Sequence, residues 1–296
     1  MVDKRILLDK FSFVKIDEPL KNYCTFKIGG KAEIFANPKT KIELMAIVNY
    51  LRSKNTNYKI IGNGSNILFL DGTIKTPIIV TTEIKGCRLL QQNVFEISAG
   101  ESLSGVALKL SKMGYSGLEF AVGIPGTVGG AVSMNAGAFG FEIKEVIQSV
   151  CYFDGEITKT LSNKNCEFGY RTSKFKKMKN AVIMSVLIKL KKCEPLAILN
   201  RVNEIINKRR DTQPSGKSAG SVFKKVEGQS AGFFIEGCGL KGKNIGGAII
   251  SPKHANFILN NNNASADDVK KLINLMVREV KAKFNKSLDL EIEIVE

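Results

Sequence analysis

Two glycine-rich stretches have residue types that can bind an anionic ligand through the main chain. The shorter, Gly62 to Asn66, stands between two apolar segments that we expect to be strands. The longer runs from Gly123 to Gly140, and no charge interrupts the chain from Phe120 to Phe141. Glycine permits positive φ and close approach to the backbone, so such turns can point consecutive N–H groups at a phosphate. The alternative for both is a tight turn without a ligand, which for the shorter one would be a hairpin turn.

Three further positions carry side chains that could do chemistry. Arg171 lies among aromatic residues just before an apolar segment, where a guanidinium could bind a carboxylate bidentately. Ser221 follows a glycine and precedes two lysines, and Glu291 alternates with Asp289 and Glu293. Taken alone, each has a plainer explanation: a solvated arginine, an ordinary loop serine and a solvent-facing row of carboxylates.

The helices and strands that must position these residues can be predicted from the spacing of apolar residues and from capping residues and glycines. Strands alternate with only a few helices, which predicts an α+β fold. Thr40 to Glu43 has the form of a capping box before a helix, and a helix over 103–113 should end at the glycine that follows. A serine caps a predicted helix over 266–284, and residues 288–295 alternate as a closing strand.

Composition limits the class of protein. The 296 residues carry 44 Lys+Arg against 28 Asp+Glu, a net charge of +16 that points to anionic partners. The aromatic residues are few and do not interleave with the basic ones, so a nucleic-acid partner is not favoured. Six widely spaced cysteines and one histidine predict reduced thiols in the cytoplasm, no metal site and no Ser-His-Asp triad. We expect neither an export signal nor a membrane span.

The motifs, taken in order, resemble the UDP-N-acetylenolpyruvoylglucosamine reductase family, in a compact form that lacks a tyrosine-bearing insertion. The resemblance runs from about Asn22 to Ile294. The motifs that carry it are Gly62-Asn63-Gly64-Ser65-Asn66, Gly123-Ile124-Pro125-Gly126 through Asn135-Ala136-Gly137, Tyr170-Arg171-x-Ser173, Gly220-Ser221-x-Phe223-Lys224, Leu240-Lys241-Gly242 through Ile245-Gly246-Gly247-Ala248, and Lys253-His254-Ala255.

The resemblance implies a vanillyl-alcohol-oxidase-like FAD-binding fold of two subdomains, residues 1–72 and 73–195, followed by an α+β substrate-binding domain, residues 196–296. FAD would be held without a covalent bond, and both glycine stretches would cradle its pyrophosphate. The residues implied as FAD contacts are Thr25, Ile28, Gly29, Gly62, Asn63, Gly64, Ser65, Asn66, Gly123, Ile124, Pro125, Gly126, Thr127, Gly130, Asn135, Ala136 and Gly137.

The resemblance also implies a reaction: NADPH-dependent reduction of UDP-N-acetylglucosamine enolpyruvate to UDP-N-acetylmuramate, for peptidoglycan synthesis in the cytoplasm. By position, Arg171 and Glu291 match the residues that stabilise the enolate, and Ser221 matches the proton donor. A carboxylate beside an enolate must be protonated or paired with a cation, so we predict a raised pKa for Glu291. The residues implied for substrate binding are Tyr170, Arg171, Arg209, Lys217, Lys225, Lys241 and His254. A monomer without membrane or nucleic-acid partners is expected.

Two alternatives stay open on the sequence. One is a different FAD-dependent oxidoreductase of the same fold that acts on another small molecule and ignores the nucleotide sugar. The other is a basic nucleic-acid-binding protein, which would be colourless and would bind its ligand with a strong dependence on salt.

Overall fold

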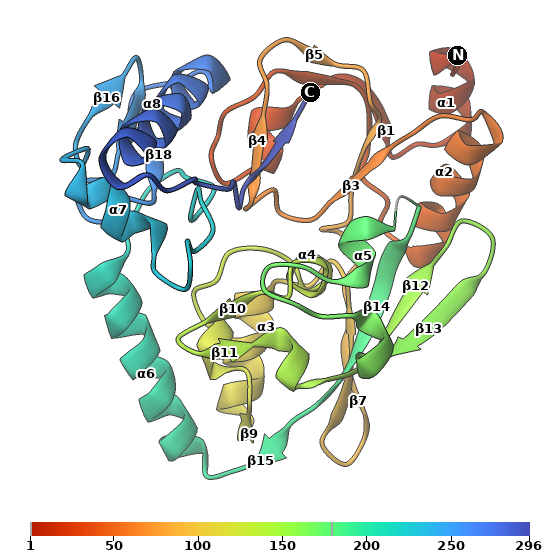
Figure 1. Ribbon diagram of the computed structural model, residues 1–296. Coiled ribbons are helices and arrows are strands. Elements are labelled where there is room, and N and C mark those ends of the chain that lie inside the picture. Colours follow the sequence, from red (N-terminus) through yellow and green to blue (C-terminus); the bar gives the residue numbers. More distant parts are fainter. Residues whose placement is uncertain (1, 179) are drawn as a thin grey trace. The chain divides into compact units, whose positions relative to one another are not determined.

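The computed structural model describes residues 2–178 and 180–296, which form a mixture of helices and strands (Figure 1). The chain divides into two compact units, each assembled from segments far apart in the sequence. The first unit comprises the chain up to Ile16, Ile34–Asn63 and Pro77–Lys208, and the second comprises Asp17–Glu33, Gly64–Thr76 and Arg209–Glu296. The predicted division into three domains, with boundaries after residues 72 and 195, stays a prediction.

A small parallel sheet and two helices build one part of the first unit. The end of strand β2 (Lys31–Ala36) pairs with β6 (Ile78–Val80), and β6 pairs with β3 (Lys59–Ile61). Helices α1 (Lys4–Lys10) and α2 (Lys41–Ser53) bury their apolar residues in the same hydrophobic cluster as this sheet. These helices therefore cover one face of the sheet, as helices commonly do in parallel sheets.

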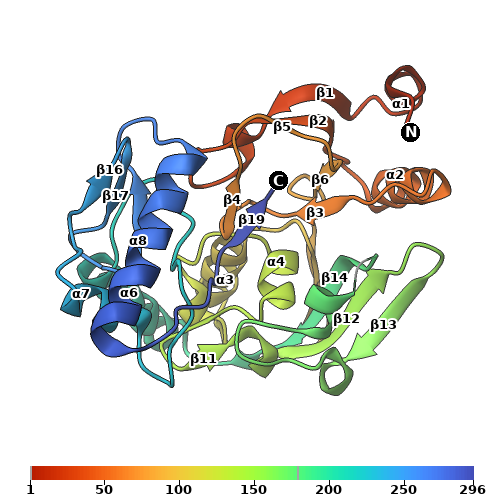
Figure 2. The ribbon, with the colours of Figure 1, turned by 45° about the horizontal axis from the view of Figure 1, so that its top comes forward.

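An antiparallel sheet forms the rest of the core of the first unit (Figure 2). Its strands lie in the order β13-β12-β14-β8-β7, with bounds Thr158–Ser162, Ile147–Phe153, Val182–Lys189, Val94–Ser98 and Cys87–Gln91. Helices α3 (Leu103–Lys112) and α4 (Val128–Ser133) pack against it, since their apolar residues share one cluster with its strands. The glycine-rich second stretch is therefore anchored on this sheet through α4.

Short elements connect these parts. Two-stranded pairs join β9 (Tyr115–Ser116) to β15 (Lys191–Lys192) and β10 (Gly137–Ala138) to β11 (Phe141–Glu142). The remaining helical turns are η1 (Leu20–Tyr23), η2 (Glu119–Ala121), η3 (Ile143–Glu145), η4 (Asn163–Cys166) and α5 (Lys174–Lys177). Strand β1 (Val14–Pro19) follows α1, and helix α6 (Pro195–Thr212) begins at the predicted boundary residue.

In the second unit, helix α8 (Ala266–Phe284) packs against α7 and a three-stranded antiparallel sheet. The bounds of these elements are α7 Ala231–Gly237, β16 Asn244–Ile245, β17 Ala248–Ile250 and β18 Ile258–Asn260. Strand β4 (Ile67–Phe69) pairs in parallel with β19 (Glu293–Val295), and the start of β2 pairs with β5 (Thr73–Ile74). The residues that follow the first glycine turn thus pair with the last strand of the chain.

The helix ends that were predicted from capping residues and glycine are confirmed. Helix α2 begins with the expected capping box, because Glu43 N–H donates to Thr40 Oγ1 at 3.1 Å and the Glu43 carboxylate accepts from Thr40 N–H at 3.2 Å. Helix α3 ends before Gly114, whose φ of +80° suits a left-handed cap. Helix α8 has the expected bounds and its own capping box at Ser265.

One prediction about a strand is wrong, and one alternative for the shorter glycine turn is excluded. Only residues 293–295 of the predicted closing strand pair as a strand, because the preceding segment bonds instead to residues 222–224, for example from Glu291 N–H to Val222 O at 2.8 Å. Asp289, Glu291 and Glu293 therefore do not share one strand face. The shorter glycine turn is not a hairpin, since β3 and β4 pair with β6 and β19 and not with each other.

The Ser265 cap gives a test of the fold. Ser265 Oγ accepts from Asp268 N–H at 3.1 Å, and Asp268 Oδ2 accepts from Ser265 N–H at 3.0 Å. We expect Ser265→Ala to lower the free energy of unfolding by about 1 kcal/mol, because a first-turn N–H loses its partner. Urea unfolding followed by circular dichroism measures this. Ser265→Asp, which restores an acceptor, should recover most of the loss; equal losses in both variants would contradict the capping role.

Candidate active site

The start of the shorter glycine stretch meets the longer one within the first unit. A Cβ added to Gly62 would lie 2.1 Å from Oγ1 of Thr127, so the backbone approaches this threonine more closely than a side chain allows. Thr127 is also the N-cap of α4, and its Oγ1 accepts from Gly130 N–H at 3.3 Å. Glycine at position 62 is therefore a condition for the two stretches to come together.

The second stretch leaves main-chain donors without protein partners. Gly123 and Gly126 have φ values of +80° and +128°. The Gly126 carbonyl accepts from Leu103 N–H at 3.1 Å, which anchors the turn on the start of α3. Among residues 2–178 and 180–296, no protein acceptor takes a hydrogen bond from the N–H groups of Asn63, Gly126 or Thr127. Main-chain N–H groups that have no protein acceptor, on two glycine turns in contact with each other, are suitable donors for the pyrophosphate of FAD.

Arg171 is presented by a tight turn that the end of the second stretch supports. Gly169 and Thr172 exchange main-chain hydrogen bonds at 3.0 and 3.3 Å, and Arg171 between them has a φ of +54°. The side chain of Asn135 is fully buried and donates from Nδ2 to Gly169 O at 3.0 Å. Arg171 Nη2 donates to Gly137 O at 3.0 Å, which directs the guanidinium.

The predicted FAD contacts at the end of this stretch use their main-chain donors within the protein. Asn135 N–H donates to Val132 O at 3.2 Å, and Ala136 N–H donates to Ala131 O at 2.8 Å. The Asn135 carboxamide oxygen accepts from Lys144 N–H at 3.3 Å. These residues form the support of the Arg171 turn, a function that the sequence does not reveal.

Ser221 and Glu291 lie on adjacent segments of the second unit. The carbonyl of Val222, the residue after the serine, accepts from Glu291 N–H at 2.8 Å and from Ile292 N–H at 3.4 Å. Asn66, at the end of the first glycine turn, donates from Nδ2 to Glu291 O at 2.9 Å. The structure therefore brings together two of the three predicted catalytic residues and one predicted FAD contact.

The segment from Thr25 to Gly30 belongs to the same unit and meets the same turn. Thr25 N–H donates to Gly64 O at 3.4 Å, and Thr25 Oγ1 donates to Ser218 O at 2.7 Å. A Cβ on Gly64, which has a φ of +57°, would lie 2.4 Å from Tyr23 O. The side chain of Ile28 is buried, so this residue can offer a cofactor only its main chain.

The residues predicted to bind the nucleotide differ in their surroundings. Lys217 and Lys225 are exposed, and Lys241 pairs with Glu236 at 2.6 Å. Burial lowers the pKa of Arg209 below its ordinary value, and this side chain donates to Gln213 at 3.2 Å.

Tyr170, also predicted to bind the substrate, is 45% exposed in the first unit. The Arg171 guanidinium carbon lies 5.2 Å from the centre of its ring.

His254 is held in one orientation. Its Nδ1 accepts from Asn256 N–H at 3.2 Å, and its ring meets Phe257 edge to face at 5.0 Å. Burial lowers its pKa, and the charge of Lys241 lowers it further. The imidazole is therefore neutral at pH 7 and can offer Nε2–H to a ligand.

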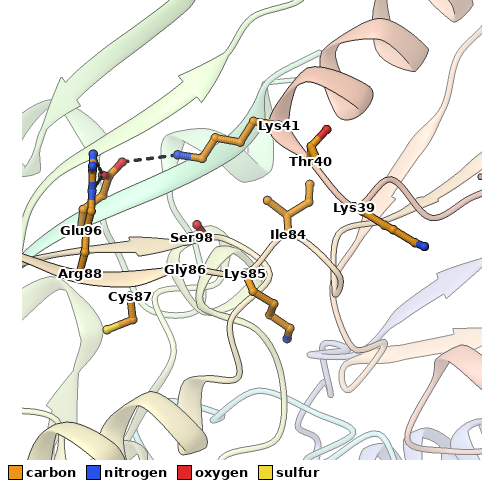
Figure 3. Close-up of a pocket in the computed structure, with 10 residues that line it drawn as sticks. All are labelled: Lys39, Thr40, Lys41, Ile84, Lys85, Gly86, Cys87, Arg88, Glu96 and Ser98. Carbon is orange, nitrogen blue, oxygen red and sulfur yellow. Dashed lines mark hydrogen bonds and ion pairs between the residues drawn. The ribbon is translucent and has the colours of Figure 1, made fainter.

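A pocket of about 400 Å³ elsewhere in the first unit contains none of the predicted site residues (Figure 3). Glu96 in its wall accepts from Arg88 at 2.6 Å and from Ser185 at 2.9 Å, and pairs with Lys41 at 3.4 Å. Burial alone would raise the pKa of Glu96, but the hydrogen bonds from Ser185 and Arg88 lower it below the ordinary value. Glu96 thus pairs with two of the four cationic side chains that line this pocket, Lys41 and Arg88.

In residues 2–178 and 180–296, no group of His, Cys, Asp and Glu side chains could hold a metal ion. Within the same residues, no helix combines the length and apolarity needed to cross a membrane.

Asn256 and Asn260 are residues that sequence reasoning missed. Each is buried and bonds to main chain next to a predicted site segment. The only sequence signal is their place: an asparagine at either end of the otherwise apolar run Phe257-Ile258-Leu259. Buried polar side chains need partners, so asparagine in such a run indicates backbone to be satisfied, but not which backbone.

Comparison with known proteins gives the class and then the family. A family model described as an FAD binding domain matches residues 32–158, and one described as UDP-N-acetylenolpyruvoylglucosamine reductase, C-terminal domain, matches residues 212–295. A crystal structure of UDP-N-acetylenolpyruvylglucosamine reductase from Thermus caldophilus superposes with a TM-score of 0.81 at 35% identity, covering 96% of this chain and 98% of that one. The α+β, vanillyl-alcohol-oxidase-like fold is confirmed, and the protein is an FAD-dependent oxidoreductase.

Comparison with proteins of similar sequence gives the same family. The chain is 43% identical to the UDP-N-acetylenolpyruvoylglucosamine reductase of Caldicellulosiruptor bescii, covering 94% of this chain and 90% of that protein. It is 40% identical to the reductase of Clostridium tetani, covering 95% and 92%. The chain belongs to the UDP-N-acetylenolpyruvoylglucosamine reductase family. Neither the nucleic-acid alternative nor a different flavoenzyme is favoured.

The single histidine gives a sharp test of the second unit. A folded-state pKa below that of the unfolded chain, about 6.5, means that the neutral form stabilises the fold above that pH and that this contribution is lost as the pH falls below it. We expect ¹⁵N NMR of the imidazole to give a pKa below 6.5 and the Nε2–H tautomer. The urea-unfolded chain, titrated in parallel, should return the ordinary value. A pKa above 6.5 or an Nδ1–H tautomer would contradict the contact with Asn256.

Gly62 tests the meeting of the two glycine stretches. We expect Gly62→Ala to weaken FAD binding roughly tenfold or more, because the added methyl forces Thr127 and its neighbouring donors to move at an overpacking cost of about 1–3 kcal/mol. Titration of the apoprotein with FAD, followed by flavin fluorescence, measures this. The control is Gly105→Ala at an exposed position of helix α3, where the added Cβ would lie 3.3 Å from Ser102. Equal affinity in Gly62→Ala and the wild type would overturn the assignment.

Proposed function

We propose that this protein reduces UDP-N-acetylglucosamine enolpyruvate to UDP-N-acetylmuramate with electrons from NADPH, through non-covalently bound FAD. This step supplies peptidoglycan precursors and so serves cell-wall biogenesis, cell shape and cell division. Relatives named for this reductase activity support the proposal over nearly the whole chain. The single structural observation that carries it is the hydrogen-bonded adjacency of the Ser221 and Glu291 segments.

FAD, when bound, supplies hydride to the terminal carbon of the enolpyruvyl group. The N–H groups of Asn63, Gly126 and Thr127 are the donors best placed to hold its pyrophosphate. We assign the main chain of Thr25 to Gly30 and of Gly64 to Asn66, which belong to the second unit and contact each other there, as further FAD contacts. Gly123, Pro125 and Gly130 act by shaping the second stretch around those donors.

Side chains of the protein stabilise the negative charge that develops during the reaction and supply the proton. Negative charge develops on the carbon next to the substrate carboxylate, and a preorganised cation stabilises it. We assign this role to Arg171, whose guanidinium is directed by Gly137 O. Glu291, protonated or paired with a cation, would stabilise the same charge; its raised pKa stays a prediction.

Ser221 donates the proton that completes the reaction. The hydrogen bonds of Val222 fix the main chain next to Ser221, which supports this role because a proton donor must be held in place. The diphosphate of the substrate would contact cationic side chains of the second unit. We assign Lys241 and Lys217 to it, with Arg209 and Lys225 as further contacts. His254, neutral at pH 7, can donate one hydrogen bond from Nε2. Tyr170 would contact the sugar.

The protein works as a monomer in the cytoplasm in this proposal. The six cysteines, none of which is in a disulfide within the described residues, suit the reducing cytoplasm.

Ser221→Ala separates the two half-reactions. We expect stopped-flow flavin reduction by NADPH to be unchanged and flavin reoxidation by the enolpyruvyl substrate to slow by about 10²- to 10⁴-fold, the usual contribution of a general acid. Ser287→Ala, at an exposed serine of the same unit, is the matched control and should leave both rates intact.

Equal loss of both half-reactions in Ser221→Ala would contradict the role of the serine as proton donor. A wild-type protein that binds FAD but is not reoxidised by the enolpyruvyl substrate would overturn the proposed reaction itself. That result would favour the alternative, a flavoenzyme with a different substrate.

A further inference from the structure

The side chain of Asn256 clamps the backbone directly after Ser221. Its Oδ1 accepts from Phe223 N–H at 3.0 Å, and its Nδ2 donates to Phe223 O at 2.8 Å. Its own carbonyl accepts from Val222 N–H at 2.9 Å. The residue is 4% exposed, so water does not replace these bonds. One carboxamide thus does for Phe223 what a neighbouring strand does in a sheet.

This clamp extends to Glu291. Val222 and Phe223 offer four main-chain polar groups, and Asn256 satisfies all of them except the Val222 carbonyl. That carbonyl is the group that accepts from Glu291 N–H at 2.8 Å. A shift of Asn256 would therefore move the segment that follows Ser221 and, through Val222, the segment that carries Glu291.

Asn260 offers a matched comparison four residues along the chain. It is 9% exposed, and its Nδ2 donates to Phe26 O at 3.1 Å and to Lys27 O at 3.2 Å. Its Oδ1 accepts from Ala264 N–H at 2.9 Å. Asn260 therefore holds the Thr25 to Gly30 segment, not the Ser221 segment. Both asparagines are buried, and each uses both ends of its carboxamide to bond main chain, but they differ in what they support.

We propose that Asn256 is a positioning residue for catalysis, which sets Ser221 and Glu291 for the protonation step without touching the substrate. Asn260 instead positions the segment assigned to FAD. The inference rests on the proposed function, because it gives Ser221 the role of proton donor. It assigns Asn256 a selective effect on one half-reaction, which a residue that only stabilised the unit would not have.

The test uses Asn256→Asp in the FAD-loaded protein. Ionised aspartate keeps the volume and the acceptor for Phe223 N–H but cannot donate to Phe223 O. We expect flavin reduction by NADPH within twofold of wild type, and flavin reoxidation by the enolpyruvyl substrate slowed roughly 10- to 100-fold, as is typical when a supporting hydrogen bond is lost. Asn260→Asp should reverse this selectivity: weaker FAD retention, but normal reoxidation of the fraction that holds flavin.

A double variant separates positioning from general stability. If Asn256 acts through Ser221, then Asn256→Asp should slow reoxidation by less than twofold when added to Ser221→Ala, because both changes remove the same contribution. Full additivity would overturn the proposal. So would an Asn256→Asp protein that cannot hold FAD, since Asn256 would then support the whole unit.

Amide hydrogen exchange of the apoprotein gives a readout that does not depend on activity. Asn256→Asp should speed exchange in peptides covering 221–223 and 290–293 but not in those covering 25–30, and Asn260→Asp should do the opposite. Unchanged exchange at 221–223 in Asn256→Asp would refute the clamp. Failure of the wild type to turn over the enolpyruvyl substrate would instead refute the proposed function and leave this exchange result standing.

Discussion

Irregular backbone carries the candidate catalytic residues, and buried irregular backbone must find partners for its polar groups. A buried N–H or C=O without a partner costs about 1–3 kcal/mol, so such segments persist only where something replaces the ladder of a sheet. Asparagine side chains do this repeatedly here. Asn135 bonds to the turn that presents Arg171, Asn66 bonds to the carbonyl of Glu291, and Asn256 bonds to both sides of Phe223.

The glycines allow backbone segments to approach one another more closely than a side chain would permit. Gly62 and Gly64 lie where a Cβ would collide with Thr127 Oγ1 and with Tyr23 O. The Gly64 collision partner is backbone, which cannot rotate away as a side chain can. Glycine thus lets the chain come close, and the donors left over at Asn63, Gly126 and Thr127 are available to a ligand. The proposed anion-binding site and the tight packing both follow from the absence of side chains at these glycines.

Local signals in the sequence predicted much of the secondary structure but little of the site's geometry. The capping boxes at Thr40 and Ser265 involve residues three apart, so they can be recognised without the fold. The partner of Glu291 lies about seventy residues away along the chain, and nothing in the alternation of residues 288–295 indicates it. Helix α4, inside the second glycine stretch, was missed because glycine disfavours helices and only packing on the antiparallel sheet compensates.

Family resemblance supplied the identities of Arg171, Ser221 and Glu291, whereas only the structure shows what holds them. Arg171 belongs to the first compact unit and the other two residues to the second, so each unit needs its own internal support. Asn135 provides it in the first unit and Asn256 in the second, although neither is adjacent in sequence to the residue it serves. Sequence spacing cannot reveal such support, because hydrogen-bond partners are chosen by the fold.

The use of asparagine rather than aspartate at these positions follows from the chemistry. A carboxylate could accept from Phe223 N–H but could not donate to Phe223 O, whereas a carboxamide does both. In the proposed mechanism, a buried carboxylate would also place negative charge near the segment of Ser221, where negative charge builds on the substrate, and so would raise the energy of the charged state. The neutral amide orders the backbone without that penalty. The same reasoning applies to Asn135, which supports Arg171, because a carboxylate there would attract the guanidinium that the proposed mechanism directs at the substrate.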